Sequence, residues 1–191
     1  MSISMTRAAI VGLTLLAAPL AQAAPLDGLS LSATYYYPDK DTPHNSATTV
    51  TNPFTVGVGA DPVIDVGFGS TKITLDFTGN TLDVLFWTYL DTSAWSDGAF
   101  NGLRITLNSP GEFTNFSMTG SSTVYNSTIG HARTSFTPHD LWIDWGALSY
   151  GTGDTLTFDI GYAAPVPLPA GLPLLALTLG GLAVLGCRRA A

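Results

Sequence analysis

A two-residue alternation of apolar and polar side chains runs through most of residues 29–162 and is broken at short intervals by Gly, Asn, Pro and Asp. Because successive side chains of a β-strand point to opposite faces, this alternation is typical of strands with one buried face. It is clearest in residues 29–35, 73–77, 103–107 and 156–162. In residues 82–89 both phases are largely apolar, which predicts a strand in the centre of its sheet.

Turn-forming residues separate these segments, and no helical period interrupts them before the C-terminal tail. The turn signals lie at residues 78–80, 97–98, 101–102, 109–111 and 151–154. Roughly ten short strands without crossover helices predict an all-β fold for residues 24–165, an antiparallel β-sandwich of jelly-roll-like type. The longest expected loop is residues 38–53, which are rich in Thr, Asn, Pro and Asp.

The expected domain is strongly acidic. The whole chain has a formal net charge of -7, but residues 24–165 contain four basic residues against all fourteen acids, a net charge of -10. Such a surface repels phosphate backbones and anionic headgroups, which argues against nucleic-acid partners and favours divalent cations or neutral glycans. The single cysteine, Cys187, lies near the C-terminus, so the domain has no internal disulfide.

The N-terminus has the three parts of a secretory signal peptide. Arg7 supplies a positive charge, an uncharged run covers residues 8–20, and Ala21 and Ala23 form an Ala-x-Ala ending. We therefore expect residues 1–23 to be a signal peptide that is cleaved after Ala23 and read by the general secretion machinery.

The C-terminus carries an apolar run of seventeen residues, 171–187, directly before Arg188 and Arg189. This length is at the lower limit for a transmembrane helix, and the paired arginines of the basic tail, residues 188–191, should stay cytoplasmic. A proline-rich motif precedes the run and disfavours helix, which holds that segment extended. Its residues are Val166, Pro167, Leu168, Pro169 and Ala170.

A short proline motif, a marginal transmembrane helix and a small arginine cluster, in that order over residues 166–191, resemble the PEP-CTERM class of sorting signals in its VPLPA variant. The resemblance implies that an exosortase, an integral membrane cysteine protease or transpeptidase, recognises the tail and processes it near residues 166–170. It implies a transient inner-membrane intermediate, then the cell surface or the exterior of a Gram-negative bacterium. It also implies an association with exopolysaccharide and biofilm production.

Catalytic motifs are missing from the sequence. The three histidines, His44, His131 and His139, stand in no motif, and each is interpreted as a solvated loop residue. The single glutamate, Glu112, lies beside an expected turn, which gives no carboxylate pair for glycoside hydrolysis. We expect a protein that is not an enzyme and has no obligate cofactor, with an unrecognised hydrolase as the least favoured alternative.

Two binding hypotheses remain open. Calcium needs oxygen ligands from loops, and Asp39, Asp41 and Asn45 are the best cluster for it, although a solvated loop explains them as well. Aromatic residues suggest stacking platforms for glycans, with Trp95 and Trp142 as the selected candidates. The other rings considered are Tyr35, Tyr36, Tyr37, Trp87 and Trp145.

The alternation rule divides these aromatic residues between two faces. Tyr36 should point away from Tyr35 and Tyr37, and Trp142 away from Trp145, so that one member of each set lies in the core. The leading expectation is a non-enzymatic surface or matrix protein, structural or adhesive in a biofilm. The alternative is a calcium- or glycan-binding module.

Overall fold

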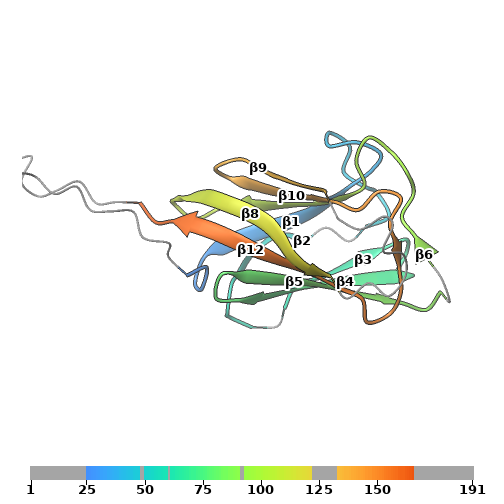
Figure 1. Ribbon diagram of the computed structural model, residues 1–191, viewed down its shortest axis with the longest axis horizontal. Helices are drawn as coiled ribbons and strands as arrows, with labels where there is room; N and C mark the ends of the chain where they lie inside the picture. The colour runs from blue at the N-terminus through green and yellow to red at the C-terminus, as the bar shows by residue number, and fades with distance from the viewer. Residues whose placement is uncertain (1–24, 48–49, 60, 91–92, 122–132, 166–191) are drawn as a thin grey trace, which may run out of the picture.

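The computed structural model of the chain describes residues 25–47, 50–59, 61–90, 93–121 and 133–165 (Figure 1). The expected signal peptide, residues 1–23, lies outside the described residues. So do the motif at 166–170, the apolar run at 171–187 and the basic tail at 188–191. The described part contains β-strands and no helix.

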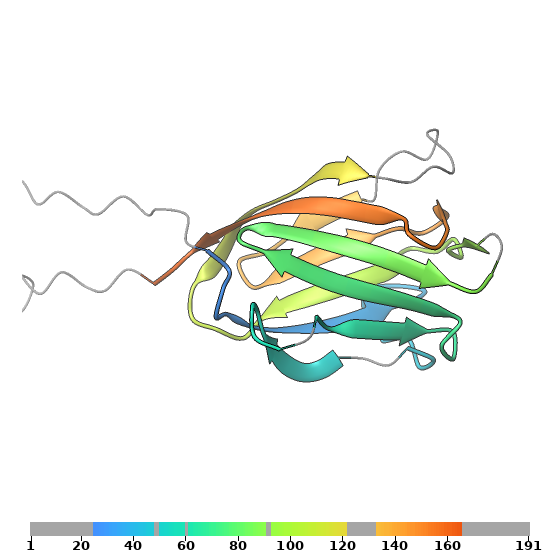
Figure 2. The same cartoon turned by 90° about the horizontal axis from the view of Figure 1, so that it is seen from below.

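Two five-stranded antiparallel sheets form the fold. Figures 1 and 2 show their arrangement from two directions. The first sheet has the order β2 (Val50–Thr55), β1 (Ser30–Tyr36), β7 (Gly102–Leu107), β10 (Asp140–Asp144) and β9 (Arg133–Phe136). The second sheet has the order β3 (Val63–Val66), β4 (Thr71–Thr78), β5 (Thr81–Thr88), β12 (Thr155–Ala163) and β8 (Glu112–Ser121). A short ribbon of β6 (Ser93–Ala94) and β11 (Ser149–Tyr150) closes one end.

The alternation seen in the sequence becomes the division between core and surface. In β5, Leu82, Val84, Phe86 and Thr88 are buried, whereas the residues between them are half-buried or exposed. The predicted central position of this strand is confirmed, since β5 is the third of five strands. The all-β antiparallel prediction is likewise confirmed for the described residues.

Two local predictions are wrong. The second part of the expected loop 38–53 forms β2, an edge strand whose pairing with β1 is irregular around Pro53. An edge position accommodates proline because its missing N–H is not needed by a further strand. The expected turn at Asn101 and Gly102 is the start of β7, and Asn101 is buried.

Gly102 is required by the close approach of β7 and β10. A Cβ at this position would lie 1.8 Å from the carbonyl oxygen of Ile143, a distance that no real Cβ can adopt. Glycine here therefore reports backbone contact between strands rather than a turn.

Both ends of the described domain meet at the turn between β4 and β5. The N–H of Leu26 donates to the carbonyl oxygen of Gly79 at 3.3 Å, and the N–H of Ile160 in β12 donates to that of Asn80 at 2.9 Å. Figures 1 and 2 show the start of the described chain and the end of β12 at the same end of the molecule. β5 starts at this turn and runs away from it over eight residues, so its last residues lie about 25 Å away.

Candidate functional site

Trp95, one of the two tryptophans selected as glycan platforms, belongs to the core. Only 7% of its surface is exposed, and its ring stacks on Tyr150 with the centroids 4.3 Å apart. It also contacts Tyr35, Phe86 and Trp145 at centroid distances of 5.5 to 6.0 Å. The prediction is corrected here: the rings that line the inter-sheet space leave Trp95 no open face for a sugar.

A hydrogen-bonded network joins two core aromatic residues, Tyr35 of β1 and Trp145, which directly follows β10. The indole N–H of Trp145 donates to the hydroxyl of Tyr35 at 3.2 Å, and that hydroxyl donates to the side-chain oxygen of Asn101. Burial raises the pKa of Tyr35 well above its usual range, which keeps the phenol neutral. This network is structural, since every member is at least nine-tenths buried.

Trp142, the second selected tryptophan, lies on the outer face of the first sheet but is covered by its own chain. The Lys40 ammonium is 4.9 Å from the ring centroid, and the Arg104 guanidinium carbon is 5.2 Å from it. Tyr36 and Phe100 contact the same ring at centroid distances of 5.5 Å. Trp142 is thus a partly buried ring with intramolecular cation–π partners. These contacts argue against its predicted role as a stacking platform.

Arg104 is held beside Trp142 by a bidentate ion pair. Its Nε and Nη2 donate to the two carboxylate oxygens of Asp140 at 2.8 and 3.1 Å, and Thr106 donates a further hydrogen bond at 2.8 Å. Burial alone would raise the pKa of Asp140, but the hydrogen bonds from Arg104 and Thr106 outweigh it and lower that pKa. The guanidinium is therefore held in place beside the Trp142 ring by Asp140.

The outer face of the second sheet carries an aromatic surface that the chain leaves open. Leu85, Trp87 and Tyr89 follow one another on the outer side of β5 and just beyond it, with 38%, 45% and 65% of their surfaces exposed. Lys72 lies directly opposite Trp87 on β4. We call these four residues the Trp87 surface.

The two rings of the Trp87 surface are neighbours. Their centroids are 6.2 Å apart with an interplanar angle of 67°, and the Lys72 ammonium is 5.7 Å from the Trp87 ring. On the same face, Thr74 and Thr155 lie beside Leu85. One step along the sheet, the hydroxyl of Thr157 donates to the Asp83 carboxylate at 2.6 Å. Apolar rings and hydrogen-bonding groups therefore share one sheet face.

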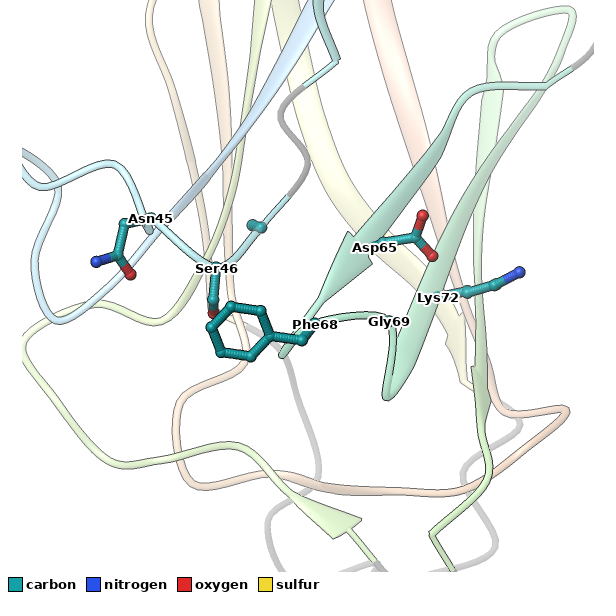
Figure 3. Close-up of a pocket in the computed structure, with 7 residues that line it drawn as sticks. Asn45, Ser46, Asp65, Phe68, Gly69 and Lys72 are labelled. Atoms are coloured by element: carbon teal, nitrogen blue, oxygen red, sulfur yellow. The ribbon is translucent and has the colours of Figure 1, made fainter.

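A surface cavity of about 520 Å³ adjoins this surface through Lys72 (Figure 3). Its wall combines the turn between β3 and β4 with the loop after β1. Phe68, at the tip of that turn, is 93% exposed and has a φ of 58°, which non-glycine residues rarely adopt. Its N–H donates to the carbonyl oxygen of Ser46 at 3.4 Å, and Figure 3 shows its ring directed toward Ser46.

The expected calcium ligands have other contacts. The Asp39 carboxylate accepts the N–H of Asp41 at 3.0 Å, and a hydrogen bond from Thr42 together with this one lowers its pKa. Asn45 belongs to the cavity wall. Within the described residues, no three His, Cys, Asp or Glu side chains gather as a metal site would require. Calcium binding at Asp39, Asp41 and Asn45 stays a prediction.

His44 lies in the loop after β1, as expected, but it is only partly exposed to solvent. Its ring is partly buried and lies edge-on against Tyr35, with the centroids 5.8 Å apart. Its Nδ1 is 2.9 Å from the Ser46 hydroxyl, a local contact between residues two positions apart. His139 is exposed, as expected, and His131 lies outside the described residues.

Trp87 is among the candidate rings of the sequence without being singled out, and no motif marks Tyr89, Lys72 or Phe68. One sequence feature does indicate the open surface: both alternating sets of side chains in β5 are largely apolar. A sheet of a two-layer fold has one inner face, so the second apolar phase of a central strand must lie on the outside. The open surface follows from that phase.

Comparison with known proteins finds no family model, no curated protein and no solved structure that matches the chain. No helix among the described residues has the length and apolar character needed to span a bilayer.

Proposed function

We propose that the chain is an exported, non-enzymatic surface or extracellular-matrix protein of a Gram-negative bacterium. An exosortase sorts it through residues 166–170 after a transient stage in the inner membrane, and the mature domain is structural or adhesive in a biofilm. The signal-peptide pattern and the ordered parts of the tail support this proposal. The jelly-roll-like topology is part of it, supported by antiparallel pairing and by a chain that changes sheet between β7, β8 and β9.

The observation that carries the proposal is the position of the domain's two ends. β12 ends at Ala163, three residues before the sorting motif, and its second half pairs with the same turn that receives Leu26. A domain attached at this end presents its opposite end, where β5 terminates, away from the membrane (Figure 2). Both outer sheet faces are then accessible to material outside the cell.

Fractionation of host cells with and without the exosortase tests the sorting step. We expect the protein in the surface or extracellular fraction of the parent, and in the inner-membrane fraction of the strain that lacks the exosortase. Intact mass of the extracellular form should show that Arg188 and Arg189 are gone. An extracellular form that retains both arginines would contradict processing.

A calcium-binding module is the alternative for the loop after β1. Thermal unfolding of the full-length chain with calcium chloride or with the chelator EGTA separates the two functions. A rise in melting temperature with calcium that Asp41→Asn abolishes would support calcium binding. An unchanged melting temperature would favour the structural role.

A further inference from the structure

We infer that the Trp87 surface is a binding site for a neutral polysaccharide chain. The inference deepens the proposed adhesive role by naming the surface and the class of ligand. It rests on that role only in assuming that the domain is exported to a place where polysaccharides are present. The binding itself follows from the exposed residues of β4 and β5.

The first argument is that Trp87 and Tyr89 are exposed although the packing of the core does not require apolar side chains at these positions. The inner phase of β5 already supplies the core contacts through Leu82, Val84 and Phe86, all nearly or fully buried. Trp87 and Tyr89 therefore add little to the core, yet they present large apolar rings to solvent. A contiguous exposed apolar patch with a polar rim is a mark of an interaction site.

The second argument concerns the chemistry of the patch. A pyranose ring has an apolar C–H face that packs on an aromatic ring and hydroxyl groups at its edge that need hydrogen-bond partners. The surface provides both kinds of partner, because the Trp87 ring lies beside the Tyr89 ring and the Lys72 ammonium, and Thr74 is opposite Leu85 on the same sheet face. An extended chain of sugars fits a row of such groups along a strand.

The third argument is charge. The described strands of the second sheet contain one basic residue, Lys72, against five acids: Asp65, Asp76, Asp83, Glu112 and Asp159. An anionic polymer would be repelled by this face, and so would a second copy of the same face in a symmetric dimer. A neutral polymer meets no such repulsion.

The cavity beside Lys72 extends the surface at one side. Phe68 stands 93% exposed at its rim, between Gly67 and Gly69, which both have positive φ values. The backbone at Phe68 has a φ of 58°, which is unfavourable for a residue with a side chain. Such local strain is commonly found at functional positions. Lys72 is the residue that this cavity shares with the Trp87 surface.

Affinity electrophoresis of the purified full-length chain tests the inference. The gels contain hydroxyethyl cellulose, laminarin or galactomannan as neutral probes and alginate as an anionic one, and the detergent is lauryldimethylamine oxide, which has no sugar headgroup. We expect retardation by at least one neutral polymer and none by alginate. Trp87→Ala should weaken that binding by about tenfold and Tyr89→Ala by a smaller factor.

Trp142→Ala is the matched control, because it removes a tryptophan from the opposite outer face, and it should bind as the parent does. Near-ultraviolet circular dichroism verifies that each variant is folded.

Absence of retardation by all three neutral polymers would overturn the inference, as would full binding by Trp87→Ala. A dimer of the parent in light scattering that Trp87→Ala dissociates would assign the surface to a second copy instead. Because the assay uses purified protein, failure of sorting in cells and failure of binding are separate outcomes.

Discussion

Trp142 and Trp87 occupy similar places on the outer faces of the two sheets. Each has a basic residue directly opposite on the neighbouring strand, Arg104 for Trp142 and Lys72 for Trp87. Trp142 is nevertheless partly buried under Lys40 and Arg104, whereas Trp87 is 45% exposed. A basic cross-strand neighbour alone therefore does not close an outward tryptophan.

The difference comes from contacts that are distant in sequence. Lys40, in the loop after β1, reaches over Trp142, and Phe100 contacts the same ring at 89°. Asp140 holds Arg104 in place with two hydrogen bonds. Trp142 therefore packs against its own domain on the first sheet, whereas Trp87 stays open to solvent on the second.

The largest change in stability is expected in the first sheet, where β7 and β10 approach each other closely at Gly102. Gly102→Ala places a Cβ 1.8 Å from the Ile143 carbonyl oxygen and must separate β7 from β10. We expect a loss of about 3 kcal/mol in the free energy of unfolding. Urea denaturation followed by tryptophan fluorescence measures it.

Gly120→Ala, on β8 of the second sheet, is the matched control. Its added Cβ meets Thr157 at 3.5 Å, an ordinary contact, so we expect a change within about 0.5 kcal/mol. Equal effects of the two substitutions would contradict the packing assigned to Gly102.

A smaller effect is expected at the ion pair that fixes Arg104. Asp140→Asn removes the negative charge that binds Arg104, so it should lower the free energy of unfolding at pH 7 by about 1 kcal/mol. The loss is modest because the Arg104 side chain is 35% exposed and water partly screens the ion pair, although Asp140 is only 17% exposed. The lowered pKa of Asp140 in the folded protein means that this stabilisation is present above its unfolded pKa of about 3.9 and is lost as pH falls through the folded value. The difference between parent and variant should therefore shrink below about pH 4.

Asp76→Asn provides the comparison on the open face. Asp76 lies directly opposite Asp83, where two like charges repel, so removing one should leave stability unchanged or raise it by a few tenths of a kcal/mol. A loss equal to that of Asp140→Asn would show that the two faces do not differ in the way described.

The smallest effect is expected at the tip of the turn between β3 and β4. Phe68→Asn should raise the free energy of unfolding by about 0.5 kcal/mol, because Asn tolerates the φ of 58° and the exposed ring contributes little packing. Thermal unfolding is the measurement. Ala147, with a φ of 63°, is the backbone control, and Ala147→Asn should gain a similar amount. A destabilised Phe68→Asn would show that the ring packs against the fold.

Much of the fold could be predicted from the alternation of side chains. The strands β1, β4, β5, β7 and β12 were expected close to their observed bounds, because each has one buried face that the pattern records. β2 could not be predicted in the same way. It is an edge strand with Pro53, and edge strands face fewer constraints on alternation.

The candidate site was predictable only in part. Alternation separates Tyr36 from Tyr35 and Trp142 from Trp145, and the structure confirms both divisions: Tyr35 and Trp145 lie in the core. Whether an outward ring is open or covered depends on loop contacts such as that of Lys40 with Trp142. No local sequence pattern encodes those contacts, so alternation alone cannot distinguish the open Trp87 from the partly buried Trp142.

Acrylamide quenching of tryptophan fluorescence tests the difference between the two faces most directly. The quencher is neutral, so the acidic surface does not bias its approach. Trp95 and Trp145 are at most 7% exposed and contribute little to quenching. Trp87→Phe should remove most of the quenchable emission, and Trp142→Phe should leave it nearly unchanged. A quenchable component that disappears with Trp142 and persists without Trp87 would contradict the assignment of the open and covered faces.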